Sequence, residues 1–381
     1  MNIKTSKSRT TSHGSRATRY ENISIIGDGG MATVLAILLC KKSEVKHKSS
    51  HEPSITSYQS PITNHQVRMW GYDRRQLQQI AKNRENKKFL PGYKLPKTLV
   101  FEPDDKRIMA DADLIVSAVP CQFMRSVWTR LKKYVPQNVP IVSVAKGIEN
   151  GTLLRPTQIL ADVLDKKRVT SHERRATKYA VLSGPTIADE LARKLPATAC
   201  AASSSESLAR DIQNIFSDGV PWLRVYTNTD VVGVELAGAM KNIIAIAAGI
   251  IDGVKLGDNV KAALLTRGLA EITRLGVAMG ARPQTFVGLT GLGDLVTTCI
   301  SPKGRNRSFG ERVGKGQTLK QASGATESVI EGIATCESVV ALAARYDVEM
   351  PITQAVYEVL FENKPVQAAV ADLMGRRLKA E

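Results

Sequence analysis

The chain of 381 residues is longer than one hydrophobic core usually serves, so we expect two domains. Hydrophobic residues make up 43% of it and charged residues 23%, which excludes wholesale disorder, and five scattered cysteines without a C-x-x-C pair give no disulfide or metal framework. The net charge of +17 is spread along the chain and only 5% of residues are aromatic, which argues against nucleic-acid binding and favours a basic pocket for an anionic ligand.

The first 20 residues are rich in Ser, Thr and Arg and contain no acidic residue. They lack an apolar targeting segment, so we interpret 1–20 as a disordered basic tail and expect a cytoplasmic protein, although transit peptides share this composition. From residue 21 onward the chain is expected to fold, apart from a polar, aperiodic stretch over 43–64 that we interpret as an exposed insertion.

The first predicted strand, 22–26, runs into the glycine turn Gly27-Asp28-Gly29-Gly30-Met31-Ala32 and a helix over 33–39. In this G-x-G-x-x-A order, Gly27 and Gly29 allow a tight turn and a close approach of the backbone to a pyrophosphate, and the helix start supplies free N–H groups. The strand, turn and helix together predict a dinucleotide-binding site. An ordinary glycine turn is the alternative.

A second strand is predicted over 66–70, and Tyr72, Asp73, Arg74 and Arg75 follow it. An acid at this place favours NAD because it binds the adenosine ribose, whereas an arginine can hold the 2′-phosphate of NADP. The sequence therefore leaves the choice between NAD and NADP open.

A helix over 76–86 and strands over 113–119, 140–145 and 179–183 continue the pattern. Short apolar strands that alternate with helical stretches predict an α/β fold, a Rossmann-like doubly wound parallel sheet with helices on both faces.

Ligands of such sheets bind beyond the carboxyl ends of the strands, where Lys146, Gly184 and Thr186 lie. After about residue 228 the patterns become mainly helical. We therefore expect a dinucleotide-binding domain over 21–228 and a mostly α-helical domain over 229–381 that carries substrate and catalytic groups.

The segment 231–251 is strongly apolar and long enough to cross a membrane. Glu235 and Lys241 fall inside it, and each would cost roughly 2.5–3.5 kcal/mol near a bilayer centre. We therefore predict a buried core helix and no membrane insertion. Because burial lowers the pKa of a lysine, Lys241 is expected either to pair with an acid such as Glu235 or to transfer protons.

Two later stretches contain glycines beside groups that bind ligands. The tight stretch 288–294 can deliver Asp294 to a cleft, or it can be a helix connector that Asp294 caps. In Gly304-Arg305-Asn306-Arg307 the fork of Arg305 matches a phosphate and Asn306 adds a neutral donor, and a solvated basic loop is the alternative.

Together these segments resemble the bacterial-type NAD(P)-dependent glycerol-3-phosphate dehydrogenase family. The matching segments keep the family's order from residue 22 almost to the C-terminus: GDGGMATVLA at 27–36, VRMWGYD at 67–73, FLPGYKLP at 89–96, VSVAKGIE at 142–149, LSGPTIADE at 182–190, the long run at 224–253, TRGLAEITRLG at 266–276, GLTGLGDLVTTC at 288–299, GRNRSFG at 304–310 and VIEG at 329–332. The resemblance implies hydride transfer between sn-glycerol 3-phosphate and dihydroxyacetone phosphate with NAD or NADP. It also implies a small-molecule substrate, a supply of glycerol 3-phosphate for phospholipid synthesis, and a homodimer.

The resemblance also implies roles for single residues. Lys241 matches the lysine that transfers the proton, Lys146 a lysine that touches both substrate and cofactor, and Asp294 an acid that could orient Lys241. The implied substrate positions are Lys146, Gly184, Thr186, Lys241, Asp294, Gly304, Arg305 and Asn306. The implied cofactor positions, together with the glycines of the turn, are Gly27, Gly29, Gly30, Met31, Tyr72, Lys146, Ala188, Arg305, Val329 and Glu331. No metal is expected.

Some positions depart from the family pattern. Gly30, Met31 and Ala32 stand where family members carry Ser or Ala, then Trp and Gly, and Gly304 stands where they often carry Ser. We therefore expect the packing around the nicotinamide and one substrate contact to differ. Two other functions stay open: a dehydrogenase for another acid, such as a 3-hydroxyacid or a 6-phosphogluconate-like acid, and a non-catalytic cofactor-binding scaffold.

Overall fold

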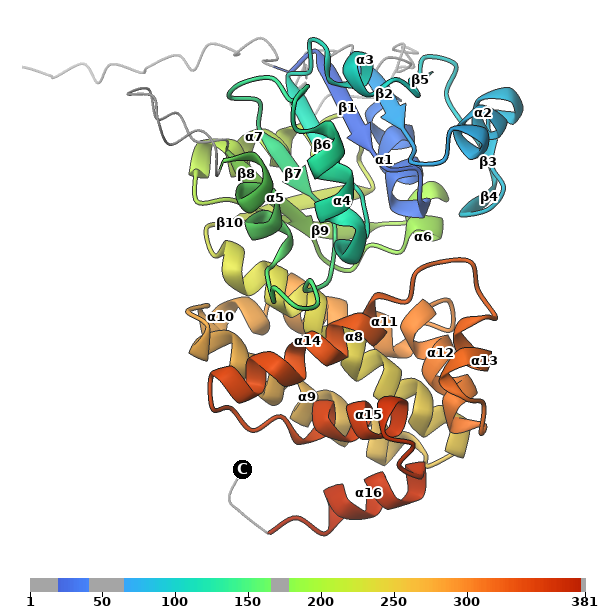
Figure 1. The fold of residues 1–381 in the computed structure, drawn as a ribbon, viewed down its shortest axis with the longest axis vertical. Coiled ribbons are helices and arrows are strands. Elements are labelled where there is room, and N and C mark those ends of the chain that lie inside the picture. Colours follow the sequence, from blue (N-terminus) through green and yellow to red (C-terminus); the bar gives the residue numbers. More distant parts are fainter. Residues whose placement is uncertain (1–19, 41–64, 166–177, 378–381) are drawn as a thin grey trace, which may run out of the picture.

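A computed structural model describes residues 20–40, 65–165 and 178–377. Residues 1–19 of the tail predicted over 1–20, and the insertion predicted over 43–64, lie outside these residues. Tyr20, which the sequence placed in the tail, is buried, and its hydroxyl donates to Asp211 Oδ2 at 2.9 Å. The folded part therefore includes Tyr20. Figure 1 shows a sheet with its helices in the upper half of the molecule and a helical half below.

The upper half is built on one sheet of eight strands, in the order β10-β9-β8-β7-β6-β1-β2-β5. The strands are β1 (Asn22–Ile26), β2 (Gln66–Trp70), β5 (Val100–Phe101), β6 (Leu114–Ser117), β7 (Ile141–Ser143), β8 (Tyr179–Ser183), β9 (Ala197–Ala202) and β10 (Leu223–Asn228). Strands β1, β2 and β5 to β8 pair in parallel, as predicted.

The sheet is parallel, as predicted, except where one pair of strands toward one edge runs antiparallel. Strand β9 pairs with β8 antiparallel, and β10 runs parallel to β9. Neither was predicted, because β9 is the alanine-rich run ATACAA, which lacks the β-branched and aromatic residues that mark strands.

Helices cover both faces of this sheet, as a doubly wound fold requires. One face packs against α1 (Gly30–Cys40) and α7 (Glu206–Ser217). The other packs against α3 (Asp105–Met109), α4 (Cys121–Leu131) and α5 (Pro156–Leu164). Figure 1 shows the sheet between these two layers.

Three short elements lie near the carboxyl ends of β1 and β2: α2 (Arg74–Asn83), a hairpin of β3 (Glu85–Asn86) and β4 (Leu90–Lys94), and α6 (Ala188–Ala192) farther along the chain. The helix predicted over 76–86 ends at Asn83 instead. Arg84 adopts a left-handed conformation with φ 49°, which stops the helix, and the next two residues pair with β4.

The lower half consists of helices arranged around α8 (Val231–Val254). The others are α9 (Asp258–Ala278), α10 (Pro283–Phe286), α11 (Asp294–Ile300), α12 (Arg305–Gly314), α13 (Leu319–Ser323), α14 (Glu331–Arg345), α15 (Pro351–Phe361) and α16 (Val366–Met374). Within the described ranges α8 is the one helix long and apolar enough to cross a membrane, and it is a buried core helix, as predicted.

Glycines let α8 and α12 pack unusually closely. A Cβ at Gly249 of α8 would lie 1.9 Å from the carbonyl oxygen of Arg307, and a Cβ at Gly310 of α12 would lie 2.0 Å from that of Ile246. Since real Cβ atoms do not come nearer than 3.0 Å, only glycine fits at these two positions. The close packing fixes the start of α12 beside the middle of α8.

A buried ion pair joins the two halves. The carboxylate of Glu235 on α8 pairs with Arg155 and accepts hydrogen bonds from the backbone N–H and hydroxyl of Thr157, at 2.7 and 2.8 Å, at the start of α5. All these partners of the Glu235 carboxylate belong to the sheet half. The alternative that it pairs with Lys241 was wrong.

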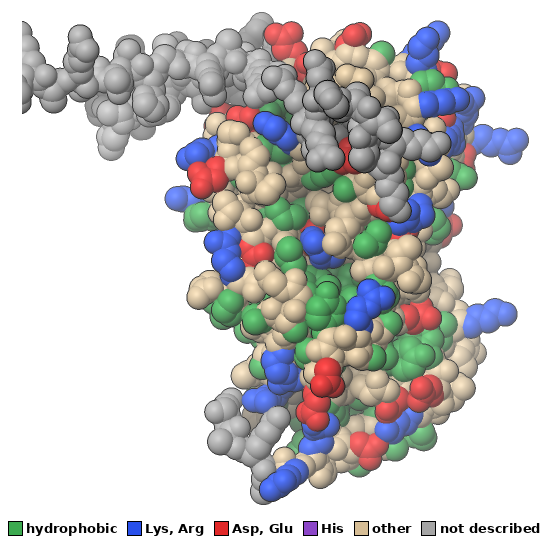
Figure 2. Space-filling model, turned by 60° about the vertical axis from the view of Figure 1, so that its left-hand side comes forward, with side chains coloured by type: hydrophobic (Ala, Val, Ile, Leu, Met, Phe, Trp, Pro, Cys, Tyr) green, Lys and Arg blue, Asp and Glu red, His purple; other side chains and the backbone are tan. Residues whose placement is uncertain are grey.

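Charges on the surface do not form a single block. On the face shown in Figure 2, Lys and Arg side chains are spread over both halves and mixed with Asp and Glu.

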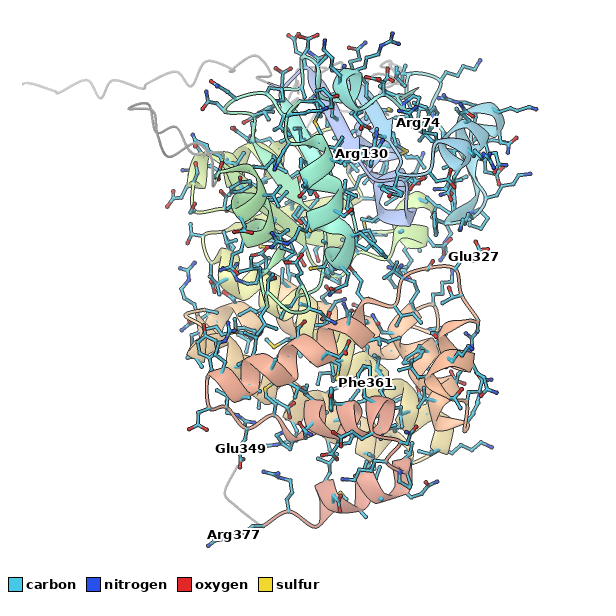
Figure 3. The ribbon with its side chains drawn as sticks, in the orientation of Figure 1. Arg74, Arg130, Glu327, Glu349, Phe361 and Arg377 are labelled. Atoms are coloured by element: carbon cyan, nitrogen blue, oxygen red, sulfur yellow. The ribbon has the colours of Figure 1, made fainter. Side chains whose placement is uncertain are left out.

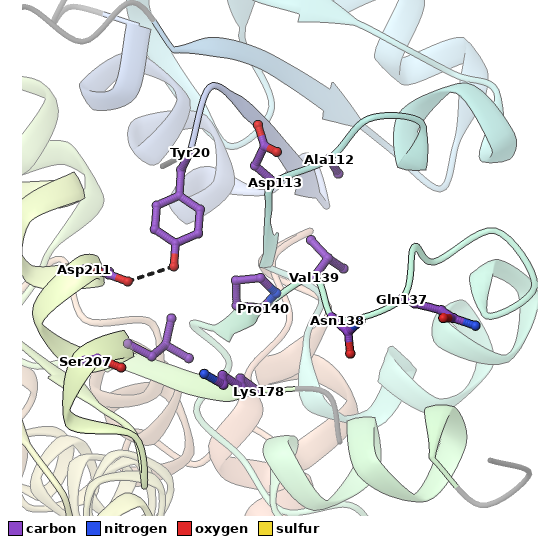
Figure 4. Close-up of a pocket in the computed structure, with 11 residues that line it drawn as sticks. Tyr20, Ala112, Asp113, Gln137, Asn138, Val139, Pro140, Lys178, Ser207 and Asp211 are labelled. Atoms are coloured by element: carbon purple, nitrogen blue, oxygen red, sulfur yellow. Dashed lines mark hydrogen bonds between the residues drawn. The ribbon is translucent and has the colours of Figure 1, made fainter. Parts of the chain in front are cut away.

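A cavity of about 680 Å³ opens just before the first residues of β6, β7 and β8. It is lined by Asp113, Pro140 and Lys178 among others, and Figure 4 shows Tyr20 reaching Asp211 at its side. It lies at the amino ends of the strands and contains none of the predicted site residues.

Candidate functional site

A second cavity, of about 470 Å³, opens where the carboxyl ends of the central strands face the helical half. Most of the predicted site residues line it: Gly29, Gly30, Met31, Lys146, Thr186, Ala188, Lys241, Asp294, Gly304, Arg305, Asn306, Val329 and Glu331. Three predicted residues, Gly27, Gly184 and Tyr72, lie outside this lining. The fold thus assembles one site from segments that span about 300 positions of the sequence.

The glycine turn forms one wall. Gly27 has φ 125°, and a Cβ there would lie 2.6 Å from the carbonyl oxygen of Ala118, so the turn from β1 into α1 needs glycine. A Cβ at Gly29, in contrast, would meet open space, and Gly29 lines the cavity. Helix α1 begins at Gly30, so its first N–H groups point to a place where a diphosphate can approach. These residues fit a dinucleotide.

The residues that follow β2 do not line this cavity, and their side chains make contacts elsewhere. Tyr72 is 63% exposed and places its ring edge-on to Trp70, with the Arg130 guanidinium 5.7 Å from its centroid. Asp73 caps α2, because its Oδ1 accepts hydrogen bonds from the backbone N–H groups of Arg75 and Gln76, at 2.8 and 3.3 Å. Arg130 lies in the upper half of Figure 3.

The centre of the site is a carboxylate shared by two lysines. Asp294 Oδ1 lies 2.6 Å from Lys241 Nζ, and Asp294 Oδ2 lies 2.7 Å from Lys146 Nζ. Lys146 Nζ also donates to the carbonyl oxygen of Gly184 at 3.0 Å. Asp294 is the first residue of α11, after the π-helical turn η2 (Leu289–Gly293), so the glycine stretch does deliver this carboxylate to the cavity.

The environment of Lys241 is suited to proton transfer. The side chain is 6% exposed, and burial lowers its pKa to about 8. Asp294 opposes this shift and Lys146 adds to it. An amine with a pKa of about 8 is both a usable acid and a usable base near neutral pH.

Two further polar residues, not predicted, complete this centre. Thr298 accepts a hydrogen bond from Lys241 Nζ through its hydroxyl, which itself donates to the carbonyl oxygen of Asp294 at 2.6 Å. Asn242 Nδ2 donates to the carbonyl oxygen of Lys146 at 3.1 Å. Thr298 lies four residues after Asp294 on the same helix, so helical spacing could have indicated it once Asp294 was known to begin a helix.

The stretch with Arg305 is a helix start and not a solvated loop. Gly304 precedes the first turn of α12, and Gly304, Arg305 and Asn306 line the cavity. The N–H groups of a first turn have no partner within the helix, so together with the Arg305 guanidinium they are able to bind an anion. Arg307 turns away and pairs with Asp252 of α8 at 2.5 Å.

Residues before and at the start of α14 close one side. Val329 accepts a hydrogen bond from Arg305 Nη1 at 3.3 Å through its carbonyl oxygen. Glu331 Oε1 accepts one from the backbone N–H of Cys121 at 3.4 Å. Burial raises the pKa of Glu331, and the nearby Arg305 counteracts this.

Ion pairs cross the mouth between the two halves. Lys303 pairs with Asp189 at the start of α6, and Lys88 of the β3–β4 hairpin pairs with Glu327 at 3.1 Å. Figure 3 shows Glu327 on the loop of the helical half that faces the sheet half. Exposed pairs of this kind contribute little stability, but they span the entrance of the cavity.

Comparison with known proteins agrees with this geometry. The family described as "NAD-dependent glycerol-3-phosphate dehydrogenase N-terminus" matches residues 22–209, and the one described as "NAD-dependent glycerol-3-phosphate dehydrogenase C-terminus" matches residues 230–371. The chain belongs to the NAD-dependent glycerol-3-phosphate dehydrogenase family. The resemblance inferred from the sequence is therefore confirmed.

Individual members of the family are similar over nearly their whole length. A glycerol-3-phosphate dehydrogenase [NAD(P)+] of Citrifermentans bemidjiense is 44% identical over 95% of this chain and 99% of its own length. One from a Geobacter species is 43% identical over the same shares. The crystal structure of glycerol-3-phosphate dehydrogenase from Coxiella burnetii is 35% identical, covers 94% of this chain and 99% of its own, and superposes with a TM-score of 0.82.

Proposed function

We propose that this protein is an NAD(P)-dependent glycerol-3-phosphate dehydrogenase that interconverts sn-glycerol 3-phosphate and dihydroxyacetone phosphate. The observation that carries the proposal is the buried amine of Lys241, held by Asp294 in a cavity that also contains the glycine turn and the start of α12. The nicotinamide cofactor, when bound, supplies or accepts the hydride. Every other task falls to side chains and backbone groups of the chain.

Lys241 transfers the proton. In the direction of reduction a hydride forms the new C–H bond at the ketone carbon, and the carbonyl oxygen takes a proton from the Lys241 ammonium, which later recovers one from solvent. In the direction of oxidation the neutral amine accepts the proton of the hydroxyl. Asp294, 2.6 Å away, holds the amine in position and stabilises its charged form.

The start of α12 binds the phosphate of the substrate. The first N–H groups of this helix, the Arg305 guanidinium and Asn306 are positioned to bind a dianion. Lys146 lies between Asp294 and Gly184 and can contact substrate and cofactor together. We assign Thr186 to the substrate, and Met31, Ala188, Val329 and Glu331 to the cofactor. For Gly27, Gly184 and Tyr72, which lie outside the cavity lining, the proposal rests on the resemblance, and for Gly27 also on the turn that it forms.

The division into domains and the biological setting are proposed as well. Residues 21–228 form the dinucleotide-binding domain and 229–381 the substrate and catalytic domain, in accord with the last strand ending at Asn228 and α8 beginning at Val231. We propose a cytoplasmic homodimer, not inserted in a membrane, that supplies glycerol 3-phosphate for phospholipid synthesis. Light scattering of the purified full chain tests the dimer directly.

The function is tested by mixing purified protein with NADH or NADPH and dihydroxyacetone phosphate. The proposal expects oxidation of the cofactor that depends on the triose phosphate, whereas a non-catalytic scaffold would bind cofactor without any turnover. Arg305→Ala should raise KM for dihydroxyacetone phosphate by about 10- to 100-fold, the usual loss for a charge-assisted hydrogen bond. Arg312→Ala, in the last turn of the same helix, is the control and should not change KM. Turnover of acids without phosphate that is indifferent to Arg305→Ala would favour the other substrate class.

A further inference from the structure

The adenosine end of the glycine turn contains an acidic residue that the motif does not require. Asp28 is the middle residue of Gly27-Asp28-Gly29 and follows β1 directly. Strands β1 and β2 are parallel neighbours that end side by side at Ile26 and Trp70. In dinucleotide-binding folds the adenosine ribose lies across these two ends, where an acidic side chain after β2 usually binds the 2′-hydroxyl.

In this chain the acidic residue after β2 is Asp73, and one of its carboxylate oxygens already accepts hydrogen bonds within α2. Asp73 uses its Oδ1 to cap α2, where it accepts from two backbone N–H groups. Arg74 and Arg75, which follow, are exposed, and no hydrogen bond or ion pair of their side chains fixes them among the described residues. Figure 3 shows Arg74 near the outer end of the sheet half. Asp73 is therefore engaged at the start of α2, and the two arginine side chains are not fixed by comparable contacts.

Asp28, in contrast, is held in place from three sides. Its Oδ2 accepts a hydrogen bond from Gln76 Nε2 of α2 at 3.0 Å. Its carboxylate lies against Gly71, the residue directly after β2, because a Cβ there would come within 2.7 Å of Oδ2. Asn86 Nδ2 donates to the backbone carbonyl oxygen of Asp28 at 2.7 Å and to the Thr33 hydroxyl at 2.8 Å, which fixes the turn itself.

Asp28 stays mainly negative at neutral pH, although its burial disfavours the charged form. Burial raises its pKa to about 6, with Asp73 adding to the shift and Lys88 opposing it. At pH 7.5 the carboxyl group is therefore still mainly ionised. A fixed negative charge, reinforced by that of Asp73, occupies the gap between the ends of β1 and β2.

We propose that Asp28 is the residue that determines cofactor choice: its carboxylate accepts a hydrogen bond from the 2′-hydroxyl of NAD(H) and repels the 2′-phosphate of NADP(H). The inference rests on the proposed function, since it concerns the cofactor of the same reaction. A ribose hydroxyl can donate to a carboxylate, whereas a 2′-phosphate offers only like charge to it. Arg74 and Arg75 carry the opposite charge and are exposed, and the proposal is that the fixed carboxylate of Asp28 outweighs them.

The test is a direct binding measurement, which does not depend on turnover. NADH and NADPH are titrated separately into the purified full chain at pH 7.5, and the change in nicotinamide fluorescence gives each Kd. The variants are Asp28→Ala and Asp28→Asn, with Glu206→Gln as a control that removes an exposed carboxylate of α7 from the same half of the molecule. Thermal unfolding checks that each variant is folded.

The wild-type protein should bind NADH at least about 10-fold more tightly than NADPH, the loss expected when a hydrogen bond to a charged group is exchanged for repulsion. Asp28→Ala should weaken NADH, strengthen NADPH and bring the ratio of the two Kd values close to one. Asp28→Asn, which can still bind the hydroxyl but is neutral, should strengthen NADPH while largely keeping NADH, and Glu206→Gln should change neither.

Two results would overturn the inference while leaving the proposed function intact. One is a wild-type protein that binds NADPH as tightly as NADH and oxidises both in the presence of dihydroxyacetone phosphate. The other is an Asp28→Ala variant with the wild-type ratio. A folded protein that binds neither cofactor would overturn the proposed function, and the inference with it.

Discussion

The close packing of α8 and α12 gives a prediction whose size follows from the structure. Gly249→Ala would place a Cβ 1.9 Å from the carbonyl oxygen of Arg307, so the two helices must part by at least about 1.1 Å to reach 3.0 Å. Overpacking of this kind costs roughly 1–3 kcal/mol. The higher helix propensity of alanine offsets at most about 1 kcal/mol of this cost. We expect a net loss in the free energy of unfolding of up to about 3 kcal/mol.

The same shift moves the start of α12, where Gly304, Arg305 and Asn306 line the cavity. A misplacement of about 1 Å in a group that positions the substrate can cost about 100-fold in rate. Gly249→Ala should therefore raise KM for dihydroxyacetone phosphate and lower kcat/KM by about 100-fold. The Kd for NADH should change much less than KM, because the glycine turn and α1 belong to the other half and only some of the cofactor positions, such as Arg305 and Val329, lie near the shifted helix start.

The assay combines steady-state reduction of dihydroxyacetone phosphate with chemical unfolding and a cofactor titration. Ile251→Val is the matched control: it lies in α8 on the side of α9 and α15, and it costs about 0.5–1.5 kcal/mol without widening the contact with α12. It should lose stability and keep KM. The reasoning is refuted if Gly249→Ala loses stability but keeps the wild-type KM, or if both variants change KM equally.

Three more predictions concern the buried charges. Because reduction needs the ammonium form of Lys241, whose pKa is about 8, kcat for reduction should be steady below pH 8 and fall above it, while kcat for oxidation should rise over the same range; parallel profiles would contradict this assignment. Asp294→Asn removes the negative charge that favours the ammonium, so the midpoint of both profiles should move below 8, and a midpoint that moves upward would contradict the electrostatic role. Glu235→Gln leaves the Arg155 charge unpaired between the halves and should lower the free energy of unfolding by about 3–5 kcal/mol; Glu206→Gln, an exposed partner of Arg210, is the control and should cost less than about 1 kcal/mol in the same urea titration.

Strands β1, β6, β7 and β8 could be predicted from the sequence because they are almost fully buried and their residues are mostly apolar. Strands β1, β2 and β8 have the predicted bounds. Strand β9 was missed because alanines carry no strand signal, and its antiparallel pairing with β8 depends on contacts distant in the sequence. The end of α2 was missed because the left-handed conformation of Arg84 belongs to a residue type that ordinarily continues a helix.

For the site, too, some residues could be predicted from the sequence and others only from the fold. Lys241 was marked by its place in an apolar helix, a signal that a single sequence contains. Its partner was not, since Asp294 and Glu235 were both candidates and only the fold decides that Asp294 meets Lys241 while Glu235 meets Arg155. The resemblance to a family supplied most of the other residues. It did not mark Asp28, whose contact with Gly71 exists only once β1 and β2 lie side by side.

The central claim is that the buried amine of Lys241 moves the proton. The most direct measurement is kcat for reduction of dihydroxyacetone phosphate by Lys241→Ala at saturating NADH, in a preparation shown to bind NADH. Loss of a positioned acid and base predicts a fall of about 100- to 10,000-fold in kcat. A variant that reduces the triose phosphate at the wild-type rate would show that the proton comes from another group, and the account of this site would be wrong.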